Sequence, residues 1–189
     1  MAFVYGDPDG IPHTMRADVE TGAIVNISLK ADGTFANGYD AAISAGGRYV
    51  VFEDYVRGED YVGGILSAFV RDTETQDITR ADIGENGALP NGDVSYSRSS
   101  LSADGCFVAF GSNSSNFVED NNNGSPNVFV KDLQTGVLTR VSTAADGTQG
   151  NGSSYEASIS ADGRYVAFSS AASNLVLDDT NDWDIFVKD

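Results

Sequence analysis

An unusual concentration of oxygen-bearing side chains lies in the stretch DNNNGSPNVFVKD, residues 120–132. A plain turn needs one or two Asp or Asn residues, but here four follow one another just before an apolar segment. Carboxylate and carboxamide oxygens at alternate positions, with a glycine that permits a sharp turn, are the ligands that a loop offers to Ca²⁺. The stretch therefore predicts either a calcium loop or a solvated turn whose asparagines bond to the backbone.

The same spacing occurs elsewhere in the chain. FVYGDPDGIPHTMRADVETG (3–22) matches FVEDNNNGSPNVFVKDLQTG (117–136) without a gap, 114 positions apart, and NLVLDDTNDWDIFVKD begins a third, partial copy at residue 174. Side chains at i, i+2 and i+6 can turn toward one point while backbone carbonyls fill the gaps. The terminal copy is richer in charge but lacks the glycine and is one residue tighter. The predicted calcium ligands are Asp7, Asp9, Asn121, Asn123, Asn127, Asp178, Asp179, Asn181 and Asp184.

Two other positions in these loops are expected to have structural roles. His13, the only histidine, lies at i+6 of the first loop, and because calcium prefers oxygen we expect it to close the loop. Asp18, Asp132 and Asp189 lie where an EF-hand carries its bidentate Glu, but each follows an extended segment and no helix. We expect these aspartates to cap the following turn by accepting hydrogen bonds from backbone amides.

The elements that position these loops are short strands in a repeat. The motifs AISAGGRYVVFED (42–54), SLSADGCFVAFGS (100–112) and SISADGRYVAFSS (158–170) recur at the spacing of the loops, about 57 residues. Each unit contains four alternating or apolar runs of four to six residues, with tight-turn signals between them and no sustained 3.6-residue period. We therefore predict an all-β chain of four-stranded antiparallel β-propeller blades, because such units bury their faces against neighbouring units.

The pattern SADGRYVAFSS, DIFVKD, TG and LTRVS resembles the TolB-type, WD40-like (PD40) propeller repeat, in its longer variant with an Asp/Asn-rich loop ahead of the third strand. The resemblance covers nearly the whole chain. It implies propeller blades and calcium-type loops, but propellers have many functions. We assign one propeller segment, 1–189, with repeats at approximately 3–59, 60–116 and 117–173 and a partial repeat at 174–189.

Strand counting gives about three and a quarter blades, whereas closed propellers have four to eight. The sequence predicts that the chain enters just before a third strand (14–18) and leaves after another third strand (185–189). Two interpretations remain open: the chain is part of a longer protein, or it associates with another copy that completes the propeller, since open sheet edges are normally closed.

A charged position recurs on the first strand of each blade, which lines the central channel in propellers. Alignment of these strands brings Asp40, Arg98 and Glu156 to one equivalent position. These residues are candidates for binding a polar ligand, and two carboxylates could also act as acid and base. Hydrated residues at a channel mouth are the structural alternative. One histidine and no G-x-S-x-G motif leave no recognisable triad.

The composition limits the partners. Eleven Lys and Arg against 28 Asp and Glu give a net charge of −17, which disfavours nucleic acid and anionic membrane surfaces. No apolar run is long enough for membrane insertion, and MAFVYGDPDG has no signal-peptide pattern. Calcium sites of this kind fill at millimolar concentrations, which favours a secreted protein in an extracellular or periplasmic setting.

The sequence thus supports a non-enzymatic, calcium-stabilised propeller module for protein or glycan binding. The alternative is a carbohydrate-active or peptidase-associated propeller enzyme with its site at the central channel.

Overall fold

The computed structural model describes residues 1–28, 38–56, 64–84, 87–94, 99–119, 123–179 and 182–189. The strands in these ranges form four antiparallel sheets, and the described residues contain no α-helix. None of them forms a helix long and apolar enough to span a membrane. The predicted all-β class is confirmed.

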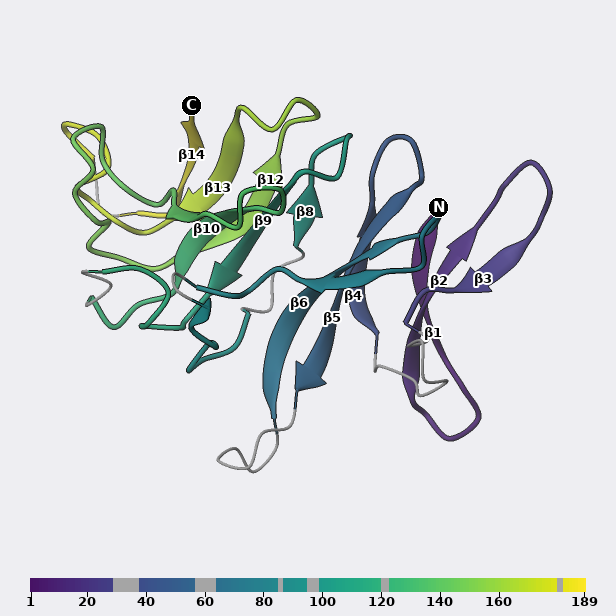
Figure 1. The fold of residues 1–189 in the computed structure, drawn as a ribbon. Helices are drawn as coiled ribbons and strands as arrows, with labels where there is room; N and C mark the ends of the chain where they lie inside the picture. The colour runs from purple at the N-terminus through teal and green to yellow at the C-terminus, as the bar shows by residue number, and fades with distance from the viewer. Residues whose placement is uncertain (29–37, 57–63, 85–86, 95–98, 120–122, 180–181) are drawn as a thin grey trace.

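The four sheets follow one another in chain order, from the N-terminal strands at one side to the C-terminal strands at the other (Figure 1). The first sheet contains three strands in the order β1 (Ala2–Gly6), β2 (Pro12–Ala17), β3 (Ile24–Asn26). The second has four, β4 (Tyr39–Ile43), β5 (Tyr49–Val56), β6 (Ile65–Asp72) and β7 (Ile78–Arg80). The third also has four, β8 (Ser100–Leu101), β9 (Phe107–Ser112), β10 (Asn127–Asp132) and β11 (Leu138–Arg140). The last has β12 (Ser154–Ile159), β13 (Val166–Ser170) and β14 (Asp184–Lys188).

The hydrophobic core is divided into layers between successive sheets. Ile27, Val50 and Phe52 are buried between the first and second sheets. A larger cluster, which contains Phe110 and Phe129, fills the space between the second and third sheets, and another with Phe168 lies between the third and fourth. Because every inner sheet has apolar residues on both faces, each needs a neighbour on both sides, as propeller blades do.

The turns between strands use the aspartates that the repeat predicts. Asp132 Oδ1 accepts hydrogen bonds from the amides of Gln134 (2.8 Å) and Thr135 (3.1 Å). Asp18 does the same with the amides of Glu20 (2.9 Å) and Thr21 (3.1 Å), so the capping role is confirmed for both residues. Asp189, at the chain end, instead accepts two hydrogen bonds from Arg164.

The first sheet differs from the sequence prediction at its first strand. Alignment equated residues 3–7 with 117–121, a loop segment, so that the chain would enter just before a third strand. In the structure residues 2–6 form β1 and pair along β2 from Ala2–Arg16 to Gly6–Pro12. In the third sheet β9 takes this place beside β10, and Phe117 is buried in the core. The run AFVY favours a strand, and its pairing satisfies backbone groups of β2 that would otherwise form an open edge.

Candidate functional site

The first predicted calcium loop is closed by its own hydrogen bonds. Asp7 Oδ1 accepts from the amides of Asp9 (2.9 Å) and Ile11 (2.8 Å), and Asp7 Oδ2 lies 3.2 Å from His13 Nε2. These contacts lower the pKa of Asp7, and the hydrogen bond from the Ile11 amide has the largest effect. Its carboxylate is thus engaged by the β1–β2 turn, and His13 is buried and closes the loop, as expected.

The asparagines of the third loop also bond within the protein. Asn123 Oδ1 accepts from the Ser125 amide (3.0 Å), and Asn123 Nδ2 donates to the Gly150 carbonyl (2.7 Å). Asn127 is fully buried; its Nδ2 donates to the Ser125 carbonyl (2.8 Å), and its Oδ1 accepts from the Ser142 hydroxyl (3.0 Å). Both side chains join the loop to the following strands.

One carboxylate of the terminal loop has an oxygen that is buried away from solvent. Asp179 Oδ2 is buried and has no hydrogen-bond partner among the described residues. Asp178 beside it has a left-handed backbone conformation with φ 61°, and Asp184 is exposed at the start of β14. Asn121 in the third loop and Asn181 in this one lie outside the described residues. Within the described residues, no three His, Cys, Asp or Glu side chains come together in a group that could hold a metal ion.

The first-strand carboxylates occupy equivalent, strained positions in two sheets. Asp40 in β4 and Glu156 in β12 have φ values of 37° and 57°, which side-chain-bearing residues rarely adopt. In both strands the register shifts here, so that two residues oppose one on the neighbouring strand. Each bulge redirects the side chain at the same place in its blade, with Asp40 half-buried and Glu156 exposed. Arg98, the third candidate, lies outside the described residues.

A buried carboxyl beside Asp40 was not predicted from the sequence. Glu53 in β5 pairs with Tyr39, the residue before Asp40, and its side chain is fully buried. Oε1 accepts a hydrogen bond from the Ser99 hydroxyl (3.1 Å), whereas Oε2 has no partner among the described residues. Burial raises the pKa of Glu53 to about 8, and the negative charges of Asp40 and Asp82 contribute to the rise. Glu53 is therefore largely protonated at neutral pH.

A second buried acid lies in the same sheet. Asp82 is fully buried and accepts from Arg80 Nε at 2.7 Å, and Arg80 also donates to the Ser67 hydroxyl (2.7 Å). Burial raises the pKa of Asp82 despite this ion pair. The sequence did carry a signal for both acids: VVFED and ITRAD place Glu53 and Asp82 where the next repeat has Gly111 and Ser142.

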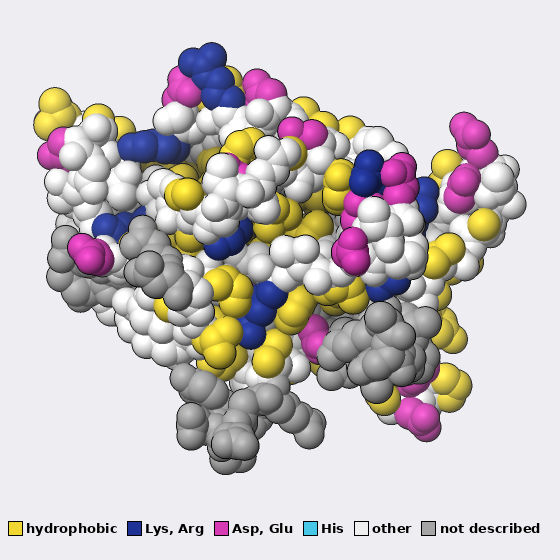
Figure 2. Space-filling model, viewed as in Figure 1, with side chains coloured by type: hydrophobic (Ala, Val, Ile, Leu, Met, Phe, Trp, Pro, Cys, Tyr) yellow, Lys and Arg dark blue, Asp and Glu magenta, His cyan; other side chains and the backbone are white. Residues whose placement is uncertain are grey.

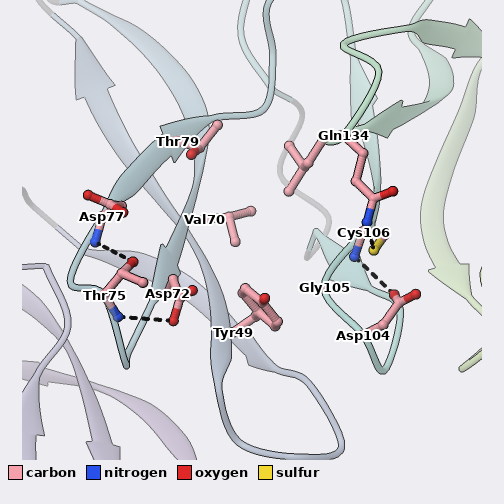
Figure 3. A pocket seen from close by; sticks show the side chains of 11 residues that line it. Tyr49, Val70, Asp72, Thr75, Asp77, Thr79, Asp104, Gly105, Cys106 and Gln134 are labelled. Carbon is pink, nitrogen blue, oxygen red and sulfur yellow. Dashed lines mark hydrogen bonds between the residues drawn. The ribbon is translucent and has the colours of Figure 1, made fainter.

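A separate cleft opens between the turns of the second and third sheets (Figure 3). Its volume is about 260 Å³, and Tyr49 and Val70 lie between Asp72, Thr75 and Asp77 on one side and Asp104, Cys106 and Gln134 on the other. Burial, followed by the neighbouring Asp104, raises the pKa of the Cys106 thiol. The thiol is thus poorly suited to act as a nucleophile.

Charge is unevenly distributed over the face drawn in Figure 2. Hydrophobic side chains gather toward its middle with Lys and Arg side chains among them, and Asp and Glu side chains lie both near the middle and around the edge. The net charge of −17 belongs to the chain as a whole, and a protein of this charge attracts cations and basic partners.

No protein-family model and no curated protein matches the sequence. The structure is similar to TolB from Acinetobacter baumannii, with a TM-score of 0.54 and 18% identity over 99% of this chain and 40% of that one. The tricorn protease gives a TM-score of 0.57 at 18% identity, over 98% of this chain and 16% of that one. The β-propeller domain of the trilobed protease from Pyrococcus furiosus, described as having an open velcro topology, gives 0.53 at 10% identity, over all of this chain and 50% of that one.

These similarities define the class of protein by its fold: the sheets are blades of a β-propeller. In its fold the chain is similar to TolB-like propellers, which agrees with the resemblance seen in the sequence. The chain spans half or less of the length of these three structures. At such identities the likeness shows the fold alone, and because the named structures include proteases beside TolB, it leaves open whether this chain catalyses a reaction.

Proposed function

We propose that the chain is a non-enzymatic β-propeller module that binds a basic segment of a partner protein at the first-strand side of its sheets. The observation that supports this function is the pair of strained carboxylates, Asp40 and Glu156, at equivalent bulges. Strained conformations of this kind persist only where the surrounding structure imposes them, and they are concentrated at functional sites. Two acidic side chains at equivalent positions of an acidic protein favour the binding of lysine and arginine side chains by electrostatic attraction.

The binding test uses a fluorescent peptide rich in Lys and Arg, titrated with the protein at low and at physiological salt. Asp40→Asn with Glu156→Gln removes both charges and keeps the side-chain shapes, and Asn tolerates the left-handed conformation at position 40. Asp9→Asn with Glu20→Gln is the control, since it changes the net charge equally in exposed turns. We expect the first pair to weaken binding by about tenfold or more and the control to change it little.

Equal weakening by both pairs would show that attraction is a general charge effect and would overturn the site. Binding of neutral oligosaccharides without binding of the peptide would make the ligand a glycan, and this protein-binding proposal would then be wrong. Hydrolytic or lyase activity that disappears in the Asp40 and Glu156 variant, with the fold retained, would favour the enzyme alternative.

We propose in addition that Ca²⁺ binds to the terminal loop and stabilises it. Such a site would be filled in an exported protein, because calcium is present there at millimolar concentration. Asp179 Oδ2, which is buried without a hydrogen-bond partner among the described residues and is close in sequence to Asp178 and Asp184, supports this loop. In the first and third loops, by contrast, Asp7 Oδ1 accepts a hydrogen bond from the Ile11 amide and Asn127 Oδ1 accepts one from the Ser142 hydroxyl. Calcium that binds only the folded state raises stability by mass action. Thermal unfolding in EDTA and at increasing calcium should show a rise in midpoint that Asp179→Asn removes and Asp77→Asn, in an exposed turn, retains. A midpoint that does not respond to calcium contradicts this part of the proposal.

A further inference from the structure

The outer face of the last sheet exposes large apolar side chains. Ile185 and Val187 in β14 are 71% and 68% exposed, and Tyr165, just before β13, is 40% exposed. Residues two apart on a strand point to the same face, and Phe186, between the two, points the other way and stacks on Phe168 at 5.8 Å. The face therefore combines an aromatic and two β-branched residues, and no other sheet in the described part of the chain covers it.

In the second and third sheets, the equivalent face is covered by the sheet that follows in the chain. In the repeat, Ile185 and Val187 correspond to Val128 and Val130 of β10, which pack against the last sheet. They also correspond to Ala68 and Val70 of β6, which are buried against the third sheet. Val128 and Ala68 are fully buried. The same positions that form sheet-to-sheet contacts inside the chain are thus exposed on the last sheet.

A second contact, between an aromatic ring and a turn glycine of the next sheet, recurs at the blade junctions and indicates that this face is one half of such a junction. A Cβ added to Gly105 would lie 2.2 Å from the Tyr49 ring, and one added to Gly163 would lie 2.4 Å from the Phe107 ring. Each aromatic residue at the start of a second strand therefore packs against the turn glycine of the following sheet. Tyr165 is the third aromatic residue in this series, and its ring is partly exposed.

The first sheet presents the opposite half of such a junction. Pairing of β1 with β2 places Phe3 beside Met15 and Tyr5 beside His13 on the face turned away from the second sheet, toward which Ala2 packs. Ile24 of β3, opposite Ala17, extends this face. Tyr5 and Ile24 are 55% and 59% exposed. Met15 corresponds to Phe129, which faces the preceding sheet in the third blade.

We propose that the face formed by Tyr165, Ile185 and Val187 docks the first sheet of a second copy of this chain, through the face formed by Phe3, Tyr5, Met15 and Ile24. The argument is continuity with the junctions inside the chain. At each of these three junctions, the face of one sheet that is turned toward the C-terminal end of the chain packs on the face of the next sheet that is turned toward the N-terminal end. The same arrangement between two copies is a head-to-tail contact and not a symmetric one. Head-to-tail contacts form closed rings or open chains, depending on the rotation between copies.

The test is sedimentation velocity of the full chain over a range of concentrations, in which we expect reversible self-association. Ile185→Thr with Val187→Thr blocks the first face, and Tyr5→Thr with Ile24→Thr blocks the second; threonine keeps the strand preference while it removes apolar surface. Val19→Thr with Leu89→Thr, at exposed positions outside both faces, is the control. Circular dichroism and thermal unfolding establish that each variant is folded.

We expect each blocked variant alone to be monomeric and the control to associate like the parent chain. A mixture of the two blocked variants should form a one-to-one complex that grows no further, because each supplies the face that the other lacks. A parent chain that is monomeric at every concentration would overturn the proposal. Folded variants that associate like the parent, or that fail to form a complex when mixed, would also overturn it.

Discussion

The second blade contains a carboxyl at a position where the third and fourth blades have small residues. Glu53 corresponds to Gly111 and Ser169, and its side chain is fully buried, with Oε1 accepting a hydrogen bond from the Ser99 hydroxyl. An ionised carboxylate in such a place lacks solvation, so the neutral acid is favoured and the pKa rises to about 8. The protein carries a buried group whose charge changes near physiological pH.

This pKa predicts that stability falls as the pH rises from about 4.5 to about 8. The pKa of Glu53 in the folded state lies above its ordinary value of 4.5, so the folded protein keeps a proton that the unfolded chain releases. The stability that this proton provides is fully present below pH 4.5 and is lost as the pH rises through about 8. Over that window the free energy of unfolding should fall by up to about 1.4 kcal/mol per pH unit. Urea unfolding of the parent chain and of Glu53→Gln, from pH 5 to pH 9, isolates the effect from other titrating groups.

We expect the two proteins to have similar stability at the acidic end and the Gln variant to be the more stable one at the alkaline end. The same pH dependence in both proteins would show that Glu53 is ionised without cost in the folded state.

At the residue scale, the sequence predicts the spacing of the polar loop residues better than the direction in which their side-chain oxygens point. The i, i+2, i+6 pattern correctly identified loops rich in oxygen, but it could not show that Asp7 Oδ1 accepts two amide hydrogen bonds within its own turn. Whether an oxygen bonds to the backbone or to an ion depends on the path of the loop. Glu53 was missed because a single carboxyl in an apolar strand resembles an exposed residue on an alternating one.

At the scale of elements, two of the three blade junctions, between the second and third sheets and between the third and fourth, depend on a turn glycine that has two separate functions. Gly163 has φ 75°, which suits the tight turn before β13, and its missing Cβ lets the Phe107 ring approach. Gly136, in the turn after β10, has φ 77° but no atom within 4 Å of an added Cβ. The two positions share the backbone requirement and differ in the contact with a neighbouring sheet.

The pair predicts unequal effects of alanine. Gly136→Ala should cost about 1 kcal/mol, from the left-handed conformation alone. Gly163→Ala should cost more, by about 1–3 kcal/mol, because the Phe107 ring must move out of a packed junction. Denaturant midpoints with unchanged slopes give both values. Equal losses would mean that the ring moves freely and that the junction is looser than its geometry indicates.

The strands themselves were predictable, because their turns contain local signals and their apolar runs have a period of two. The first strand was the exception. Alignment of 3–22 with 117–136 is correct for β2 and its turn, but β1 pairs with β2 where the third sheet uses β9. Sequence similarity identifies equivalent residues, whereas strand pairing depends on which backbone edges are available.

At the scale of the whole molecule, a basic side chain links each sheet to the one before it. Lys131 Nζ donates to the Ile83 carbonyl (2.7 Å), and Lys188 Nζ donates to the Thr143 (3.1 Å) and Ala144 (2.9 Å) carbonyls. In the second sheet, Arg71 Nη1 donates to the Ile27 carbonyl (3.4 Å). Because each sheet contacts only its neighbours, stability depends on these junctions one by one, as in other repeat proteins.

A stack of this kind predicts that opening begins at its ends. Hydrogen exchange should be slowest for amides of β9 and β10, which lie between two other sheets, and faster for β3 and β14. Lys188→Met keeps the apolar stem but removes the link to the third sheet, so exchange in β13 and β14 should accelerate while β5 and β6 keep their rates. Arg164→Met is the matched control, because its ion pair with Asp189 is exposed and contributes little to stability. If Lys188→Met accelerated exchange equally in all four sheets, the blades would unfold as one cooperative unit, and the junctions could not be treated as separate contributions.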